Sequence, residues 1–246
     1  MKRVSIPELI NCYIFRFFNF KIEKINRTFE YKRSRLISVI KPDLVIDGGA
    51  NIGQWALELD KKHPKLKIWS FEPLQDSRNL LESRANVRST EWKVFPFALG
   101  KKDGRRQMNI ASNQQMSSSF LIPSFHTRLR PDILFTKTEE VSVIALDTIK
   151  DQLNEFQSIF LKLDVQGSEM DAILGALNIL KKVSIIEIES SFTPLYDGET
   201  AHHELIAKIK SLGFTPFFIT VPHAEPSGRQ YALDTILIND DLLYLL

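Results

Sequence analysis

The stretch L-V-I-D-G-G-A-N-I-G, residues 44–53, decides the fold, because an apolar run stops at an acid and breaks into glycines. Residues 44–46 lack polar alternation, which is typical of a strand covered on both faces, as in a parallel sheet. Glycine permits positive φ and close backbone approach, and a helical apolar pattern begins at Ile52. The stretch therefore predicts a strand, a tight loop and a helix, with a ligand at the strand's carboxyl end.

The acid in this loop indicates which ligand it would bind. A dinucleotide loop reads G-x-G-x-x-G and holds a pyrophosphate on the amides of a helix start. Here Asp47 stands two residues before Gly49, and its negative charge would repel phosphate. An acid beside a glycine loop suits a ligand with an ammonium group and no phosphate, such as the amino-acid end of S-adenosylmethionine. The competing interpretation is a strand-to-helix turn that binds no ligand.

A second acid, Glu72, follows the next predicted strand, residues 67–71. An acid at the end of the second strand of a βαβ unit accepts hydrogen bonds from both ribose hydroxyls of a bound nucleoside. NAD and S-adenosylmethionine both carry such a ribose, so Glu72 predicts a nucleoside without distinguishing the two. The choice of S-adenosylmethionine rests on Asp47 and on the missing glycine.

The composition fits one α/β domain in a reducing compartment. The chain has 246 residues, of which 43% are hydrophobic, enough for one substantial core. Its 32 basic and 30 acidic residues leave a net charge of +2, which is too small to indicate nucleic-acid binding. Cys12 is the only cysteine, so neither an intrachain disulfide nor a thiolate metal cluster can form. Because the sequence shows no signal peptide and no integral membrane segment, we expect a cytoplasmic protein.

Residues 1–40 read as an N-terminal helical extension, followed by the main domain over residues 41–246. The extension carries an apolar stripe, and nine basic residues stand against three acidic ones. We favour a helix that lies over the domain or pairs with a second subunit in a homodimer. The alternative is an amphipathic segment in weak peripheral contact with an anionic membrane.

The remaining chain alternates strand and helix patterns, which predicts a mostly parallel sheet with helices on both faces. Residues 101–140 show a weaker pattern, with a hairpin turn at Asp103-Gly104 and a polar, mobile run at residues 114–119. Residues 123–131 read either as an irregular lid over the site or as a solvated loop. Further strands are expected at residues 92–97, 141–146, 159–163, 183–189, 214–220 and 233–238.

Several segments together resemble the FkbM family of methyltransferases. They are residues 44–54, the F-E-P of residues 71–73, A-L-G-x-x-D-G, V-x-x-L-D-T-I, and L-K-L-D-V-Q-G-S-E-M-D-A-I-L-G-A at residues 161–176. The resemblance implies a Rossmann-like class I methyltransferase fold, with a mostly parallel seven-stranded sheet, and methyl transfer from S-adenosylmethionine, usually to a hydroxyl oxygen. Gly48 replaces the family's usual valine, which loosens the loop.

The resemblance also implies the residues of the site. Asp47, Gly49, Asn51 and Gly53 would surround the methionine end of the cofactor, and Glu72 would hold its ribose. Ala98 and Leu99 would line the adenine. Asp164 would lie near the ammonium group and the methyl group that is transferred.

An alcohol acceptor needs a base that takes its proton, because the sulfonium already activates the methyl group. Candidate catalytic residues are Asp164, Lys162 and His126, although a surface position is the commoner one for such a histidine. Glu169 would serve as a base or orient its loop. Lys162 interrupts an apolar strand, so it needs a carboxylate partner, and Glu187 on the adjacent strand could supply one.

No metal site is predicted, because carboxylates spaced by strand periodicity, as in Asp164, Glu187 and Glu189, are commoner than magnesium sites. The leading interpretation is an O-methyltransferase that acts on a sugar, a glycan or another small molecule. The alternatives are methyl transfer to nitrogen or carbon, an NAD-binding nucleotide-sugar enzyme, and a cofactor-binding module without catalysis. The missing G-x-G-x-x-G argues against NAD, and the intact acids Asp47, Glu72 and Asp164 argue against a module without catalysis.

Overall fold

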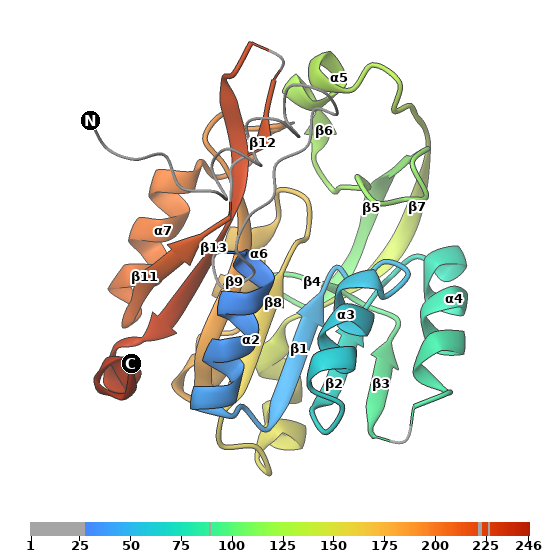
Figure 1. The fold of residues 1–246 in the computed structure, drawn as a ribbon. Helices are drawn as coiled ribbons and strands as arrows, with labels where there is room; N and C mark the ends of the chain where they lie inside the picture. The colour runs from blue at the N-terminus through green and yellow to red at the C-terminus, as the bar shows by residue number, and fades with distance from the viewer. Residues whose placement is uncertain (1–27, 89, 221–222, 226) are drawn as a thin grey trace, which may run out of the picture.

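A computed structural model describes residues 28–88, 90–220, 223–225 and 227–246, and its centre is an eight-stranded sheet (Figure 1). Seven strands follow the order β11-β13-β9-β8-β1-β2-β3, and β12 (His223–Ala224) pairs with β13. The strands are β1 (Leu44–Gly48), β2 (Lys67–Phe71), β3 (Trp92–Phe95), β8 (Ile159–Leu163), β9 (Val183–Ser191), β11 (Phe214–Ile219) and β13 (Gln230–Asn239). The prediction of an α/β fold is confirmed, although the described sheet has one strand more than expected.

The main sheet is mostly parallel. The neighbours β3, β2, β1, β8 and β9 pair in parallel, whereas β13 runs antiparallel to both β9 and β11. Every residue of β1 and β8 is buried, because helices cover both faces of the sheet. The carboxyl ends of β1, β2 and β8 therefore meet at one edge, where the acids that follow the strands gather.

Two apolar cores, one on each face of the sheet, hold the helices in place. One core joins the sheet to α2 (Phe29–Ile40), α3 (Gln54–Lys62) and α4 (Gln75–Ala85). The other joins it to α6 (Glu169–Leu174), α7 (His202–Ser211) and two 3-10 helices, Leu146–Leu153 and Ile179–Lys182. The expected placement of helices on both faces is thus confirmed.

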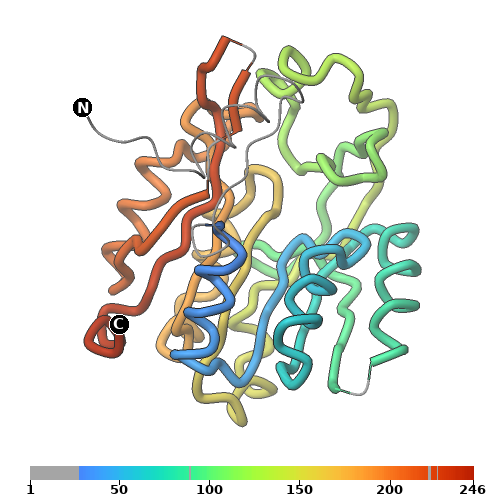
Figure 2. The backbone as a smooth tube through the Cα atoms, in the orientation of Figure 1, coloured from blue at the N-terminus to red at the C-terminus, as the bar shows by residue number. Residues whose placement is uncertain are grey.

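A separate three-stranded sheet follows the third parallel strand. It consists of β4 (Ala98–Leu99), β5 (Gly104–Ala111) and β7 (Phe135–Ile144), with β7 in the middle. The predicted hairpin at Asp103-Gly104 is wrong, because the strands on either side of this turn both pair with β7 and not with each other. Figure 2 shows that the chain between β5 and β7 stands above the carboxyl ends of the main sheet.

We call this connection, residues 112–134, the cap. It contains β6 (Ile122–Pro123), which pairs with β10 (Tyr196–Asp197), and the short helix α5 (Phe125–Leu129). The predicted polar run at residues 114–119 is less solvated than expected, because its last three serines, Ser117, Ser118 and Ser119, are buried. The cap is therefore packed onto the domain through polar side chains.

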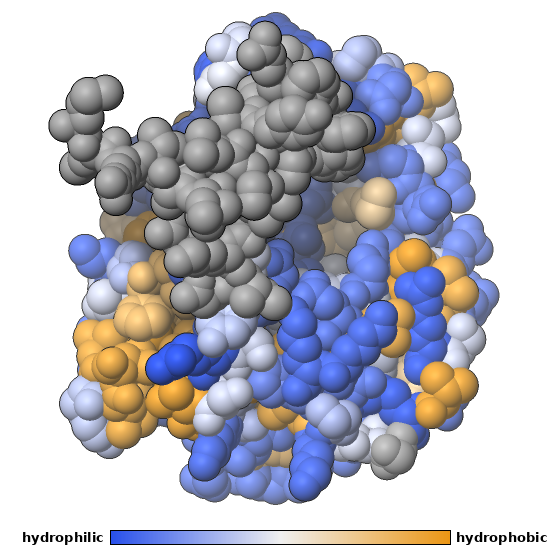
Figure 3. All heavy atoms as spheres, viewed as in Figure 1, coloured by the Kyte–Doolittle hydropathy of each residue, from blue (hydrophilic) through white to orange (hydrophobic). Residues whose placement is uncertain are grey.

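Most of the predicted N-terminal extension, residues 1–27, lies outside the described residues, and the membrane question lies there with it. Its described part holds α2, which packs on the main sheet. No helix in the described ranges combines the length and the apolarity that a bilayer crossing needs. Figure 3 shows apolar side chains gathered near β11 and the C-terminus, where Phe217, Ile219, Tyr244 and Leu246 are exposed. The boundary at residue 40 and the homodimer remain predictions.

Candidate active site

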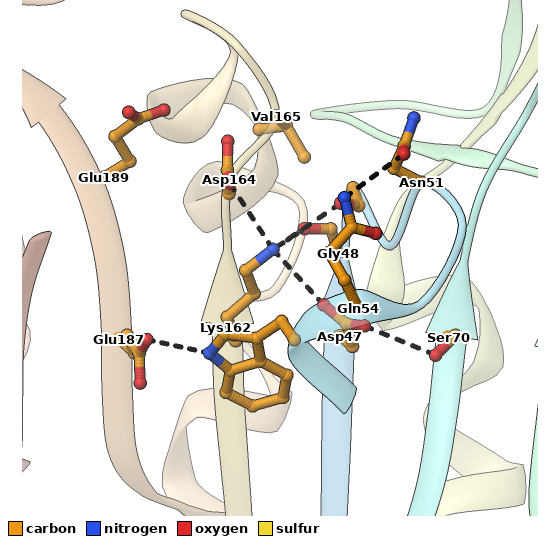
Figure 4. A network of polar contacts seen from close by, with 12 residues as sticks. Asp47, Gly48, Asn51, Gln54, Ser70, Lys162, Asp164, Val165, Glu187 and Glu189 are labelled. Carbon is orange, nitrogen blue, oxygen red and sulfur yellow. Dashed lines mark hydrogen bonds and ion pairs between the residues drawn. The ribbon is translucent and has the colours of Figure 1, made fainter. Parts of the chain in front are cut away.

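A row of polar side chains crosses the main sheet just below its carboxyl edge. The strand register sets Glu187 of β9 beside Lys162 of β8, Lys162 beside Asp47 of β1, and Asp47 beside Ser70 of β2. All four are buried, and Asp47 has no exposed surface. Figure 4 shows the Lys162 ammonium group directed at Asp47, Asp164 and the loop after β1.

Lys162 takes a different partner from the one predicted. Its Nζ lies 3.3 Å from Asp47 Oδ1 and 3.7 Å from Asp164 Oδ2. Glu187 accepts hydrogen bonds from Arg33 and from the Trp55 indole, both at 2.9 Å, so the predicted Lys162–Glu187 pair is wrong. Burial alone would lower the pKa of Lys162, but Asp47, Asp164 and Glu187 raise it, so the lysine stays charged.

This pairing changes how Asp47 can act. Burial raises the pKa of Asp47 above its usual range, and the charge of Lys162 opposes that change. Because the side chain has no exposed surface, its carboxylate does not face the cleft above the sheet edge. Asp164 does face it, with a side chain that is 38% exposed. Direct binding of the cofactor by Asp47 remains a prediction. Its contact with Lys162 ties the end of β1, and with it the loop after β1, to β8.

A cleft lies between the carboxyl ends of β1, β2 and β8 and the cap. Its lower wall contains most of the residues that the sequence assigned to the cofactor: Gly49, Asn51, Glu72, Ala98, Leu99 and Asp164. Its upper wall includes Met108 and four cap residues, Gln115, Met116, Ser118 and Phe120. Asp47 and Gly53 do not line it; Gly53 is the N-cap of α3, with φ 83°.

The loop after β1 depends on a backbone conformation that its sequence permits. Gly49 has φ 75°, and a Cβ atom there would overlap the main-chain oxygen of Asp164. Asn51 has φ 47°, a region that asparagine tolerates better than most residues. The two adjacent loops of the cleft, after β1 and after β8, can therefore approach closely only with glycine at position 49.

Two main-chain amides, one from the loop after β1 and one from the loop after β2, hold the carboxylate of Glu72 in place. Its Oε2 accepts a hydrogen bond from Asn51 N and its Oε1 from Leu74 N, both at 2.8 Å. Each oxygen keeps a second lone pair, so the carboxylate can still accept two hydroxyl groups. Burial raises the pKa of Glu72 to about 7, although the two amides lower it.

The cap touches the cleft loops through hydrogen bonds. Asn51 Nδ2 donates to Gln114 O at 3.0 Å, and Ser77 Oγ donates to Gln115 Oε1 at 2.6 Å. Ser119 Oγ donates to Gln166 O at 2.6 Å. The cap therefore closes the cleft from above, and the enclosed volume is about 50 Å³.

His126 lies apart from the cleft. The predicted surface position is wrong, because the side chain is buried and its ring packs against those of Phe135 and Tyr196. Burial lowers the pKa of His126, and its Nδ1 has no hydrogen-bond partner among the residues that the structure describes. A catalytic role for His126 remains a prediction that the geometry does not favour.

Glu169 is buried at the start of α6, and its Oε1 accepts a hydrogen bond from Val165 N at 2.9 Å. Burial raises the pKa of Glu169 from 4.5 to about 8. Folding therefore favours the protonated form, and this contribution to stability is complete below pH 4.5 and is lost as the pH rises through 8.

We expect Glu169→Gln to remove this pH dependence, because glutamine keeps the acceptor oxygen and cannot ionise. The free energy of unfolding of the variant should exceed that of the wild type by about 3 kcal/mol more at pH 8.5 than at pH 5. Urea unfolding at the two pH values measures the difference. Glu204→Gln, an exposed acid in the first turn of α7, should change nothing. Equal pH dependence in the Glu169 variant and the wild type would contradict the assignment.

Within the described ranges, no group of three or more histidine, cysteine, aspartate or glutamate side chains has the arrangement of a metal site. Two of the acids considered for magnesium already face a cation of the protein: Glu187 binds Arg33, and Asp164 faces Lys162. That the reaction needs no metal remains a prediction.

The sequence did not single out three side chains that shape this site. Gln166 donates from Nε2 to Asp164 Oδ1 at 2.8 Å and to Glu189 Oε2 at 2.9 Å. Tyr196 OH donates to Gln166 Oε1 at 2.8 Å, and Arg33 reaches Glu187 from α2. Gln166 carried a signal, since a polar residue stands two positions after a strand-end acid, but nothing in the sequence links Arg33 to residue 187.

Comparison with known proteins places these motifs in a family. A model described as the Methyltransferase FkbM domain matches residues 47–216. The 2-O-methyltransferase NoeI of Sinorhizobium fredii is 26% identical over 174 residues, which cover 67% of this chain and 71% of NoeI. The 31-O-demethyl-FK506 methyltransferase FkbM of Streptomyces tacrolimicus is 23% identical over 193 residues, which cover 70% of this chain and 73% of that protein.

Solved structures of similar shape include magnesium protoporphyrin IX methyltransferase, ChlM, from Synechocystis PCC 6803, crystallised with bound S-adenosylmethionine. The superposition covers 97% of this chain and 99% of ChlM, with a TM-score of 0.45 and 9% sequence identity.

Proposed function

Since this chain belongs to the family of FkbM methyltransferase domains, we propose that it methylates a hydroxyl oxygen of a small polyhydroxylated molecule, such as a sugar or a glycan. The family match confirms the resemblance read from the sequence and makes the chain a methyltransferase that depends on S-adenosylmethionine. The names of two relatives, a 2-O-methyltransferase and a 31-O-demethyl-FK506 methyltransferase, support oxygen as the acceptor atom.

One observation carries the proposed placement of the cofactor: acids or loops at the ends of three neighbouring parallel strands line a single cleft. In this placement, Glu72 accepts the two ribose hydroxyls, Ala98 and Leu99 line the adenine, and Asp164 accepts the ammonium group. The chemical types fit, because the cleft offers carboxylates to a cation and to hydroxyl groups.

The space in the cleft sets a condition on binding. A volume of about 50 Å³ is far below the roughly 300–1,000 Å³ of typical cofactor sites. Gln115 and Met116 of the cap must therefore move outward when the cofactor binds. Their tethers are a few hydrogen bonds, to Ser77 and to the Gln54 amide, which face the rim of the cleft.

The chain's own residues then supply alignment and exclusion of water. When bound, S-adenosylmethionine supplies a methyl group on a positively charged sulfur. Lys162 holds Asp164 and Asp47 in place, so that the loops after β8 and β1 keep their separation. The cap covers the cleft, and a reaction between an alcohol and a sulfonium gains most from such positioning.

Calorimetry with S-adenosylhomocysteine and with NAD tests this assignment against the dinucleotide alternative. We expect S-adenosylhomocysteine to bind and NAD not to bind. Glu72→Gln should weaken binding of S-adenosylhomocysteine about 10- to 100-fold, because hydrogen bonds to a charged carboxylate contribute about 1.5–3 kcal/mol. Glu140→Gln, which changes an exposed carboxylate of β7, is the matched control and should bind normally. Binding of NAD alone would overturn the proposal.

The acceptor atom has two other candidates, nitrogen and carbon. Incubating the protein with candidate acceptors and a methyl donor that carries a tritiated methyl group labels the product. Treatment of the product with strong acid then distinguishes the three cases by the amount of label released, because methyl ethers, N-methyl amines and C-methyl compounds differ in their resistance to acid. We also propose a cytoplasmic location, which the single cysteine supports, because disulfides are rare in reducing compartments.

A further inference from the structure

Two cavities share Gln166 among their lining residues. The cleft above β1 and β2 lies on one side of it and includes Asp164. A second cavity lies on the other side, where Gln166, Glu189, Ser190 and Tyr196 are among its lining residues. Its volume of about 10 Å³ is close to the minimum that holds a single water molecule, so it can take one hydroxyl group. The proposed methyl donor and a hydroxyl in this cavity would be neighbours.

The amide of Gln166 holds one carboxylate on each side of this boundary. Its Nε2 donates to Asp164 Oδ1 at 2.8 Å and to Glu189 Oε2 at 2.9 Å. Tyr196 OH donates to its Oε1 at 2.8 Å, and the same hydroxyl lies 3.0 Å from Ser117 O. Tyr196 is 1% exposed, so the group that fixes the amide has no freedom to turn away. Figure 4 shows Glu189 on β9 and Asp164 just beyond the end of the neighbouring strand β8.

We propose that Glu189 accepts the proton of the acceptor's hydroxyl group, and that Gln166 and Tyr196 are positioning residues that hold Glu189 beside Asp164. This inference rests on the proposed function, because it needs the methyl donor in the cleft. It divides the two carboxylates by cavity: Asp164 faces the cofactor and Glu189 faces the acceptor. The acceptor that this arrangement suits is an alcohol, which must lose a proton when its oxygen gains a methyl group.

The charge state of Glu189 links it to cofactor binding. Burial, followed by the negative charges of Asp164 and Asp234, raises the pKa of Glu189 well above its usual range. Without a cofactor, the protonated form of Glu189 is therefore favoured. Bound S-adenosylmethionine brings an ammonium and a sulfonium to this side, and two positive charges favour the ionised carboxylate. The ionisable groups that face Glu189 come from three elements and two loops: Asp234 on β13, Glu169 on α6, Tyr196 on β10, Asp164 in the loop after β8, and Glu199 in the loop after β10.

The step balances without an added reactant. The acceptor's oxygen forms a bond to the methyl carbon while the carbon–sulfur bond breaks, and its electron pair remains on sulfur. The O–H bond of the acceptor breaks, and its proton moves to the carboxylate of Glu189. The products are a methyl ether, S-adenosylhomocysteine and protonated Glu189, which loses its proton again when the next cofactor binds.

Proton release on cofactor binding tests this without knowledge of the acceptor. Calorimetric titration with S-adenosylmethionine, in buffers that differ in ionisation enthalpy, gives the number of protons released per cofactor bound at each pH. We expect the wild type to release close to one proton near pH 7 and Glu189→Gln to release at least five-fold fewer. Because the neutral glutamine cannot take up the charge that the bound cations favour, the variant should also bind S-adenosylmethionine about ten-fold more weakly near pH 7. S-adenosylhomocysteine, which lacks the sulfonium charge, should release fewer protons than S-adenosylmethionine.

Asp234→Asn is the matched control. It removes another partly buried carboxylate, the register partner of Glu189 on β13, but one that lines neither cavity. We expect it to keep the proton release and to move its midpoint to lower pH, because one negative neighbour is gone. Undiminished release in Glu189→Gln would overturn the inference while leaving cofactor binding in place. Absence of any binding by the wild type would overturn the proposed function, and the inference with it.

Two further variants keep the test independent of folding in Glu189→Gln. Glu189→Asp retains the carboxyl group and should retain proton release with a shifted midpoint. Tyr196→Phe keeps the buried ring and loses only the hydroxyl group, so it should shift the midpoint through Gln166 without abolishing release. Identical pH profiles in Tyr196→Phe and in the wild type would contradict the positioning role.

Discussion

Replacing Lys162 with methionine should lower the free energy of unfolding by about 3–5 kcal/mol, because it leaves a buried carboxylate without its counter-charge. Asp47 has no exposed surface, and Lys162 Nζ is 3.3 Å away. Within the described part of the chain, only Ser70 then remains as a hydrogen-bond partner of Asp47, at 3.4 Å. A protein of this kind has about 5–15 kcal/mol of stability in total, so the loss is a large share. Urea unfolding measures it.

A double-mutant cycle separates the pair from the packing of the side chain. Adding Asp47→Asn to Lys162→Met removes the uncompensated charge, so the double variant should regain at least half of the loss. Lys67→Met is the control, since Lys67 forms partly exposed pairs with Glu91 and Glu155 and its loss should cost less than about 1 kcal/mol. If Lys162→Met costs as little as that control, the ion pair is not structural. If it stays folded and binds S-adenosylhomocysteine but has lost activity, Lys162 has the catalytic role that the sequence suggested.

The second large effect is expected from Gly49→Ala, which should weaken S-adenosylhomocysteine binding by about 100-fold. A residue with a Cβ atom pays about 1–2 kcal/mol at φ 75°, and this Cβ atom would also overlap the main-chain oxygen of Asp164. The loops after β1 and β8 must then separate. Because both loops contribute to the cleft, a small displacement misaligns the groups that hold the ligand.

The adjacent glycine is the control. A Cβ atom at Gly48 would lie 2.7 Å from Leu99 Cδ1 and 3.0 Å from Leu163 Cδ2, both at the ends of flexible side chains. Its nearest main-chain atom, Lys162 O, would be 3.3 Å away, against 1.9 Å for Asp164 O at position 49. Gly48→Ala should therefore change binding by less than about five-fold, since its neighbours can move by a few tenths of an ångström. Equal losses for the two variants would show that the loop tolerates no added atom, and would contradict the special position of Gly49. Calorimetry on both proteins decides.

Strands β1 and β8 were predictable because each combines an apolar run with an acid at its end. Residues 44–46 and 159–161 show this pattern, and both segments are buried strands in neighbouring positions of the sheet. The convergence of Glu72 and Asp164 on one cleft followed from the same rule, since parallel strands end at one edge.

The sequence could not assign partners across the sheet. Register alone places Lys162 between Asp47 and Glu187, and both are carboxylates at the right height. The choice between them depends on Arg33, which forms an ion pair with Glu187. Arg33 lies on α2, far from Glu187 in the sequence, so no local pattern links the two residues. The three-stranded sheet was missed for a related reason. Its middle strand β7 is distant in the sequence from both of its partners, β4 and β5, so the turn between β4 and β5 carries no sign of this pairing.

The ion pair between Arg33 and Glu187 has a consequence for how this protein can be recombined. The two side chains are 2.9 Å apart and almost fully buried. Helix α2 therefore places a positive charge against β9, the strand that also carries Glu189, two residues after Glu187 and on the same face. A chimera joined at residue 40 would take its acid from one parent and its arginine from the other. Exchange of the leading helix between relatives therefore succeeds only if the incoming helix supplies a cation at the same height.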